Sequence, residues 1–175
     1  MAEDPKVQEL WDREQIRDCL FRYCRGIDRN DEATLRSVYW EDATDNHGAY
    51  RGSATGFIEW ALQALAMIER GVHQIHNVLI EFREGGAVVE SYFSALQRQP
   101  GPDGRLVQWH MAGRYVDWFE KRGGEWRVAE RTVVYDWVEE TPLPAGSEEE
   151  RFGARRPIGG RRPDDPVYEL LKARP

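Results

Sequence analysis

Residues 71–82 read GVHQIHNVLIEF and open the half of the chain that decides its fold. Apolar and polar residues alternate along this stretch, which is typical of a β-strand with one buried face. Further runs rich in β-branched and aromatic residues follow: AVVESYFSALQRQ (87–99), RLVQWHMAGRYVDWFEK (105–121) and EWRVAERTVVYDWVEE (125–140). The loops between them, REGG, PGPDG and KRGG, are typical of β-hairpins. The sequence therefore predicts a meander of long antiparallel strands.

The first seventy residues have a helical period instead. A long amphipathic helix is predicted over PKVQELWDREQIRDCLFRYCRGID (5–28), and a shorter one, capped by Asn30 or Asp31, within RNDEATLRSVYW (29–40). A third is predicted over SATGFIEWALQALAMIER (53–70), with Gly71 as its C-terminal stop. The turn-rich segment EDATDNHGAYRG (41–52) favours a short strand or hairpin. Helices followed by a meander indicate an α+β domain, with helices packed on one face of a curved, mostly antiparallel sheet.

The composition changes after Glu140. Residues 1–140 are expected to form one domain, and residues 141–175 an extended tail rich in arginine and proline. Near its end, DDPVYELL (164–171) has Asp165 at a capping position and Pro166 in the first turn, which predicts a short docking helix.

Charge and composition exclude several classes of function. The formal net charge of −7 argues against nucleic-acid binding, which depends on neutralising phosphates. No apolar stretch is long enough for a membrane span, and MAEDPKVQEL lacks the apolar core of a signal peptide, so a cytoplasmic protein is expected. A glycine-rich phosphate loop, a nucleophile elbow and a cysteine–histidine motif are all missing from the sequence. Cys19 and Cys24 lie too far apart around the first helix to pair within it, and reduced thiols are expected.

His73 and His76 are two of the four histidines in the chain. Residues three apart face opposite sides of a regular strand, so the pair is not expected to share a metal ion. No other residues have a recognisable metal-ligand spacing, and neither a metal nor a cofactor is expected. From the residues alone, a packed structural role and a catalytic role remain open for each histidine.

Other polar residues have a structural and a chemical interpretation as well. Asp28 ends the first helix, where its carboxylate either forms a salt bridge or orients a catalytic histidine. His110 lies between bulky apolar neighbours and either packs or takes part in catalysis. Arg131 either lies on a strand surface or binds an anion, and Tyr23 and Tyr135 either pack or donate a proton.

Taken together, parts of the chain resemble the SnoaL-like branch of the nuclear-transport-factor-2-like superfamily, which includes scytalone dehydratase, a dehydrochlorinase and a bile-acid dehydratase. The resemblance runs from about Gln8 to Glu140 and rests on YCRGIDRNDEATLRSVYWEDA (23–43), HQIHNV (73–78) and GRYVDWFEKRGGEWRVAERTVVYDW (113–137). It implies a cone-shaped α+β barrel, whose strongly curved sheet encloses an apolar pocket. It also implies acid–base chemistry on a buried substrate without a metal or an organic cofactor.

In the dehydratase-like members of this branch, a His–Asp dyad is the base. Its aspartate lies in a Tyr-x4-Asp pattern, which Tyr23 and Asp28 match here. Its histidine opens the first long strand, often with a small or polar residue four positions later. His73 with Asn77 matches that pattern best, and His76 is the alternative.

The resemblance assigns the remaining candidates more loosely. A second catalytic histidine falls near His110, and a basic residue of the last strand falls near Arg131. Tyr135 occupies the place of an arginine in the bile-acid enzyme, which argues against that substrate class.

The expected function is that of a lyase or isomerase, either dehydratase-like or polyketide-cyclase-like, acting on an apolar molecule, which can be cyclic. His73, held by Asp28, would remove a proton, while Tyr23 or His110 assists. The substrate would be contacted by His76, Asn77, Arg131 and Tyr135. The alternative is a non-catalytic small-molecule binding or oligomerisation module. A homodimer is expected, with a homotrimer as the alternative, because Tyr92, Trp109 or Trp118 would expose aromatic surface on the outer sheet face.

Overall fold

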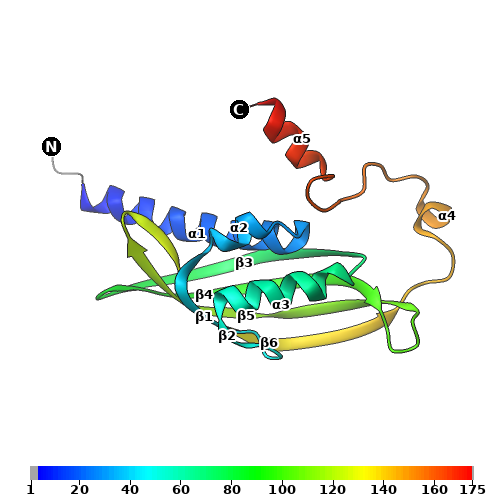
Figure 1. The fold of residues 1–175 in the computed structure, drawn as a ribbon, viewed down its shortest axis with the longest axis horizontal. Helices are drawn as coiled ribbons and strands as arrows, with labels where there is room; N and C mark the ends of the chain where they lie inside the picture. The colour runs from blue at the N-terminus through cyan, green and yellow to red at the C-terminus, as the bar shows by residue number, and fades with distance from the viewer. Residues whose placement is uncertain (1–3, 175) are drawn as a thin grey trace.

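A computed structural model describes residues 4–174 of the chain (Figure 1). The helices are α1 (Pro5–Arg29), α2 (Glu32–Arg36), α3 (Ala54–Ala66), α4 (Glu148–Phe152) and α5 (Pro166–Ala173). The strands are β1 (Tyr39–Asn46), β2 (Arg51–Ser53), β3 (Arg70–Arg83), β4 (Gly86–Pro100), β5 (Leu106–Arg122) and β6 (Glu125–Pro142). Residues 1–3 and 175, included in the expected domain and tail, lie outside the described residues.

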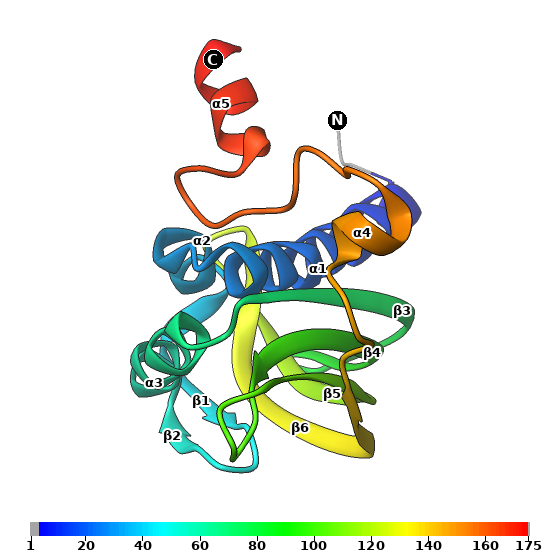
Figure 2. The ribbon, with the colours of Figure 1, turned by 90° about the vertical axis from the view of Figure 1, so that its right-hand side faces the viewer.

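All the strands form one open, mixed, six-stranded sheet in the order β2-β1-β6-β5-β4-β3. Strands β3 to β6 are the predicted antiparallel meander, whereas β1 pairs with β6 in parallel. Viewed from its end, the sheet curls from β3, under α1, round to β1 and β2 beside α3 (Figure 2). The predicted α+β class, with helices packed on one face of a strongly curved sheet, is confirmed. The curl brings strands from opposite edges of the sheet around one interior.

Two of the irregularities in the strand pairing shape that interior. Between Ile75 and Val78 the register of β3 against β4 shifts, because one extra residue is accommodated in β3. A further shift between β5 and β6 lies at Ala112 and Gly113, where β6 accommodates the extra residue. A Cβ added to Gly113 would lie 2.1 Å from the carbonyl oxygen of Val134. Only glycine permits that close approach of β5 and β6.

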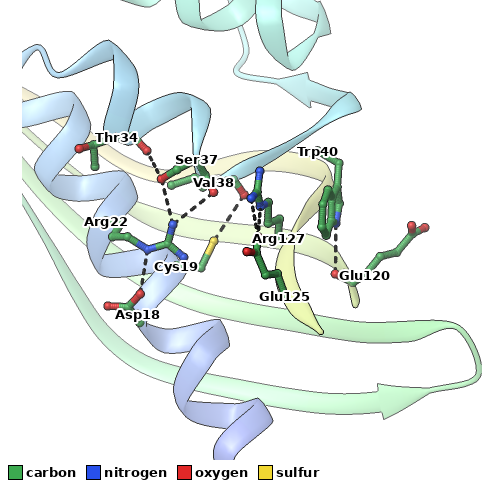
Figure 3. Close-up of polar contacts among 10 residues, drawn as sticks. All are labelled: Asp18, Cys19, Arg22, Thr34, Ser37, Val38, Trp40, Glu120, Glu125 and Arg127. Carbon is green, nitrogen blue, oxygen red and sulfur yellow. Dashed lines mark hydrogen bonds and ion pairs between the residues drawn. The ribbon is translucent and has the colours of Figure 1, made fainter. Parts of the chain in front are cut away.

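Helix α1 lies across the concave face because one stripe of it is apolar. Ile16, Cys19, Leu20 and Tyr23 follow helical spacing and are all buried in the core. On another face of α1, Arg22 donates a hydrogen bond to Asp18. Its guanidinium also donates to the hydroxyl and carbonyl oxygens of Ser37, as Figure 3 shows.

The buried thiol of Cys19 also reaches the start of β1, with its sulfur 3.4 Å from the carbonyl oxygen of Val38 (Figure 3). Burial raises the pKa of this thiol to about 12, so it stays protonated as a weak donor. Helix α1 is thereby anchored to the connection that leads into β1.

The predicted third helix is too long. Helix α3 ends at Ala66, and Arg70 and Gly71 already belong to β3, so Gly71 is not a helix stop. The αR residue Met67 follows the last turn of the helix instead. The second helix is also shorter than its sequence window: it comprises five residues and is capped by the side chain of Asp31.

The tail docks through its last third. Asp165 caps α5, with Pro166 in its first turn, as the sequence predicts. The side chains of Arg162 and Tyr168 both contact the Asp31 carboxylate, at 2.7 and 3.0 Å. Before that, the tail arches out beyond the ends of the strands around α4 (Figure 1), where Glu148 pairs with Arg70 of β3 and Arg98 of β4.

Candidate active site

Asp28 and His73 form a closed pair where the end of α1 meets the start of β3. The His73 ring nitrogen Nδ1 lies 2.7 Å from Asp28 Oδ1, and the His73 backbone N–H donates to Asp28 Oδ2 at 2.9 Å. Their side chains are only 9% and 8% exposed. Because both carboxylate oxygens are engaged, the ring is fixed with Nδ1 towards the carboxylate. Nε2 is then left for another partner.

His73 lines an interior cavity with a volume of about 620 Å³, which we call the inner cavity. Its wall is formed by α1, α3 and the concave sheet face, and is mostly apolar. The aromatic side chains of the wall are Tyr23, Phe57, Trp60, Phe93, Trp109, Tyr115 and Tyr135. A cavity of this size, walled by aromatic groups with few polar ones, is typical of small-molecule sites.

A second histidine–carboxylate pair reaches the same cavity from near the opposite edge of the sheet. His47 Nδ1 lies 3.2 Å from Oδ1 of Asp45, whose side chain is fully buried. The His47 ring stacks on Phe57 with centroids 4.5 Å apart. His47 follows β1 and His73 lies on β3, so the curl of the sheet presents two oriented imidazoles to one cavity.

Arg131 lies beneath the cavity in a fully buried ion pair. Its guanidinium makes two bonds to the Asp117 carboxylate, at 2.8 and 2.7 Å. The group also stacks between the rings of Tyr23 and Tyr115, 4.2 and 4.3 Å from their centroids. This paired and stacked arginine supports the cavity floor and is not free to bind an anion.

The same arginine connects to the second histidine pair. Arg131 lies 3.4 Å from the hydroxyl of Tyr39, which donates to Asp45 at 2.7 Å. Asp45 therefore has one oxygen bound by a tyrosine and the other facing His47. The chain of contacts fixes the position of Asp45 and, through it, of His47.

Burial sets the protonation of the groups around the floor. Burial raises the pKa of Tyr23 and of Tyr115 well above the ordinary value, so both phenols stay neutral. Burial also disfavours the charge on Arg131, but Asp117 together with Tyr39 and Tyr23 outweighs it, and the pKa of Arg131 lies well above its usual range. Tyr23 can therefore act in the cavity as a neutral hydrogen-bond donor.

Some residues expected to contact a substrate lie elsewhere. His76 is exposed and lies 2.9 Å from the Ser94 hydroxyl, while Asn77 is exposed beside it. Both occupy the irregular pairing between Ile75 and Val78, so they face away from the interior. His110 is also exposed, because β5 turns its odd-numbered residues, such as Met111, inward. None of the three lines the inner cavity; Tyr135 does.

Sequence reasoning missed His47. It lies in a turn-rich segment with no long apolar pattern, and only its spacing of two from Asp45 puts the two side chains on one face. It also did not pair Arg131 with Asp117, which the register of β5 and β6 sets directly opposite each other.

Within residues 4–174, His, Cys, Asp and Glu side chains do not gather in groups of three or more that could hold a metal ion. Over the same range, every helix is too short or too polar to cross a membrane.

These features define a class of protein: an α+β cone with an open curved sheet, an aromatic interior cavity and a histidine–carboxylate pair at its wall. A family model described as "SnoaL-like domain" matches residues 8–132. The chain belongs to this SnoaL-like family, as the sequence resemblance predicts.

Solved structures share the fold. A hexachlorocyclohexane dehydrochlorinase, LinA type 2, is 21% identical, with 87% of this chain and 99% of that chain covered and a TM-score of 0.70. A protein provisionally named as a scytalone dehydratase, from Novosphingobium aromaticivorans, is 19% identical (79% and 93% covered, TM-score 0.68). A protein from Kribbella flavida is 16% identical (75% and 95% covered, TM-score 0.67). A search of curated proteins finds no significant match.

Proposed function

We propose that this protein is a cofactor-independent lyase of the dehydratase type, with His73 as its general base. The main support for this proposal is the Asp28–His73 pair at the wall of an aromatic cavity of about 620 Å³. Membership of a family whose structural neighbours include a dehydrochlorinase supports this reaction class.

The geometry suits proton abstraction from carbon. With its Nδ1–H donated to Asp28, the neutral His73 ring has its lone pair on Nε2. That nitrogen takes a proton next to an electron-withdrawing group of the bound substrate, and the Asp28 carboxylate stabilises the imidazolium that forms. The apolar wall keeps water away from the base and the carbanion.

The leaving group departs from the neighbouring carbon as a double bond forms. Hydroxide leaves only when it is protonated, so a dehydration needs an acid as well as a base. His47, held by Asp45 in the same cavity, is the proposed acid, and the neutral Tyr23 phenol is placed to donate to an oxyanion. His47 takes the role that the sequence resemblance assigned to His110.

The proposed substrate is a small, largely apolar and cyclic molecule, because apolar and aromatic side chains predominate in the wall of the inner cavity. An isomerase or cyclase would use the same base without the leaving-group acid. A non-catalytic binding protein is the second candidate, favoured by the predominance of apolar lining around two histidines and two glutamines.

The decisive experiment measures exchange of carbon-bound hydrogen in deuterated water. A ligand recovered with the purified protein by native mass spectrometry, or a panel of cyclic β-hydroxyketones, is incubated with the protein and followed by NMR. Deuterium incorporation or water loss that disappears in His73→Ala supports the enzyme. Tight binding without any exchange would leave the binding protein as the function.

A further inference from the structure

A second cavity, also about 620 Å³ in volume, lies on the other side of His73; we call it the arginine cavity. Ile27, Leu65, Ile68, His73 and Gln97 line both cavities, so the two adjoin at the candidate base. The arginine cavity differs in chemistry, because Arg29, Arg70, Arg98 and Arg161 all line it.

Arg70 and Arg98 are direct neighbours across β3 and β4. Like charges placed opposite each other on a sheet destabilise it unless an anion lies between them. Here the anion is the carboxylate of Glu148. Its Oε1 lies 2.6 Å from Arg70 Nη2 and 2.7 Å from Arg98 Nη2. Hydrogen bonds from Arg70 and then Arg98 lower the pKa of Glu148 to about 2.

The other two arginines have fixed structural partners. Arg29 pairs with Asp165, the cap of α5, at 3.1 Å. Arg161 donates to the carbonyl oxygens of Leu65 and Ile68 at the end of α3. Arg70 and Arg98 are therefore the two guanidinium groups in this cavity whose main partner comes from the arching part of the tail. In addition, the Arg98 Nε is buried without an acceptor among the described residues.

Glu148 belongs to a weakly attached segment, so another carboxylate can replace it between the two arginines. Residues 144–147 and 149–159 around it are exposed. The neighbouring polar contacts stay within the segment: Ser147 with Glu150, and Arg156 with Glu149. Helix α4 therefore reaches the sheet through Glu148, and such a segment has a low local free energy of opening.

We propose that Arg70 and Arg98 form a binding site for the carboxylate of a small organic ligand whose apolar body lies against Ile27, Leu65 and Ile68 in the arginine cavity. Glu148 occupies the site until the ligand displaces it. Two guanidinium groups converge on one carboxylate oxygen, as the contacts of Glu148 Oε1 show, and such charge-assisted bonds are strong. Glu69, 3.8 Å from Arg98, and the nearby Asp28 favour a monoanion over a dianion such as phosphate. Binding at this site does not require that the dyad be catalytic.

The test is a calorimetric titration of the full-length protein with benzoate. Glu148→Gln removes the competing charge, and Glu149→Gln is the matched control, one residue away and paired only distantly with Arg156. If Glu148 fills the site about nine-tenths of the time, Glu148→Gln binds benzoate roughly tenfold more tightly than the native chain, whereas Glu149→Gln does not. Adding Arg98→Gln to Glu148→Gln abolishes the gain.

A further titration isolates the charge. Neutral benzamide is expected to bind no better to Glu148→Gln than to the native chain. Because these titrations measure binding and need no turnover, a failure of the proposed catalysis is distinguishable from a failure of this site. Equal benzoate affinity in Glu148→Gln and the native chain, or a gain that survives Arg98→Gln in a folded variant, would overturn the proposal. So would tighter binding of inorganic phosphate than of benzoate.

Discussion

The Asp28 carboxylate contacts both the ring and the backbone N–H of His73, although the two residues are 45 positions apart in the chain. One oxygen holds Nδ1 and the other holds the amide N–H. The second bond fixes the start of β3 against the end of α1, so the position of the ring is set by the backbone as well as by its own hydrogen bond. This rigidity is what a general base requires if it is to meet a substrate without reorganising.

The first prediction concerns this pair. His73→Ala removes the base and should lower turnover by at least about 100-fold. Asp28→Asn should have a comparable effect, because an amide N–H donated to Nδ1 would shift the ring proton to Nε2, the wrong tautomer for a base. Hydrogen exchange into a cyclic substrate, followed by NMR in deuterated water, measures both.

His76→Ala is the control for the dyad variants, since His76 lies on the exposed side of the same strand. It should retain full turnover. A loss of activity in His76→Ala equal to that in His73→Ala would contradict the assignment of the base.

The second prediction separates acid from base. His47→Phe keeps an aromatic ring against Phe57 but has no proton to give. Elimination of hydroxide should slow by about 100-fold, the typical contribution of a general acid. Elimination of a good leaving group, such as chloride, from an otherwise matched substrate should change little. Equal losses for both leaving groups would show that His47 has a structural role alone.

The third prediction tests the buried ion pair. Arg131→Met leaves Asp117 without its partner in a fully buried site, and we expect a loss of about 3–5 kcal/mol of unfolding free energy. Urea denaturation monitored by tryptophan fluorescence measures it. Adding Asp117→Leu should recover much of the loss, because the uncompensated charge is gone; no recovery would mean that the stacking on Tyr23 and Tyr115 dominates.

The fourth prediction is a homodimer. Leu79, Val88, Tyr92, Leu96 and Val116 are exposed on β3, β4 and β5, on the face of the sheet away from α1. Removing this apolar surface from water would favour association. Light scattering at micromolar concentration should give twice the chain mass, and Tyr92→Lys should shift it towards the monomer. A monomeric native protein would disprove the association.

The aromatic residues expected on that face only partly lie there. Trp109 lines the inner cavity, and its indole N–H donates to Glu140. Trp118 is half-buried and donates to Glu120. The apolar surface available for a dimer is therefore formed by Tyr92 and its aliphatic neighbours, without the two tryptophans.

Local sequence determined the elements and one half of the candidate site. The helical period of α1, the alternation in β3 to β6 and the glycine-containing hairpin loops are properties of neighbouring residues, and they predict the α+β class directly. The candidate pair of Asp28 and His73 could be recognised from the sequence. Asp28 lies at the end of the first helix and His73 at the start of the first long strand, which are the positions of the dyad in the family pattern.

Tertiary structure decided the rest, because it depends on residues that are distant in the chain. The irregular pairing between Ile75 and Val78 changes which side chains face inward, and strict alternation cannot reveal it. The curl of the sheet brings His47 to the cavity that His73 lines, and strand register sets Arg131 against Asp117. The contact of Glu148 with Arg70 and Arg98 arises only when the tail folds back over the sheet, which no local pattern encodes.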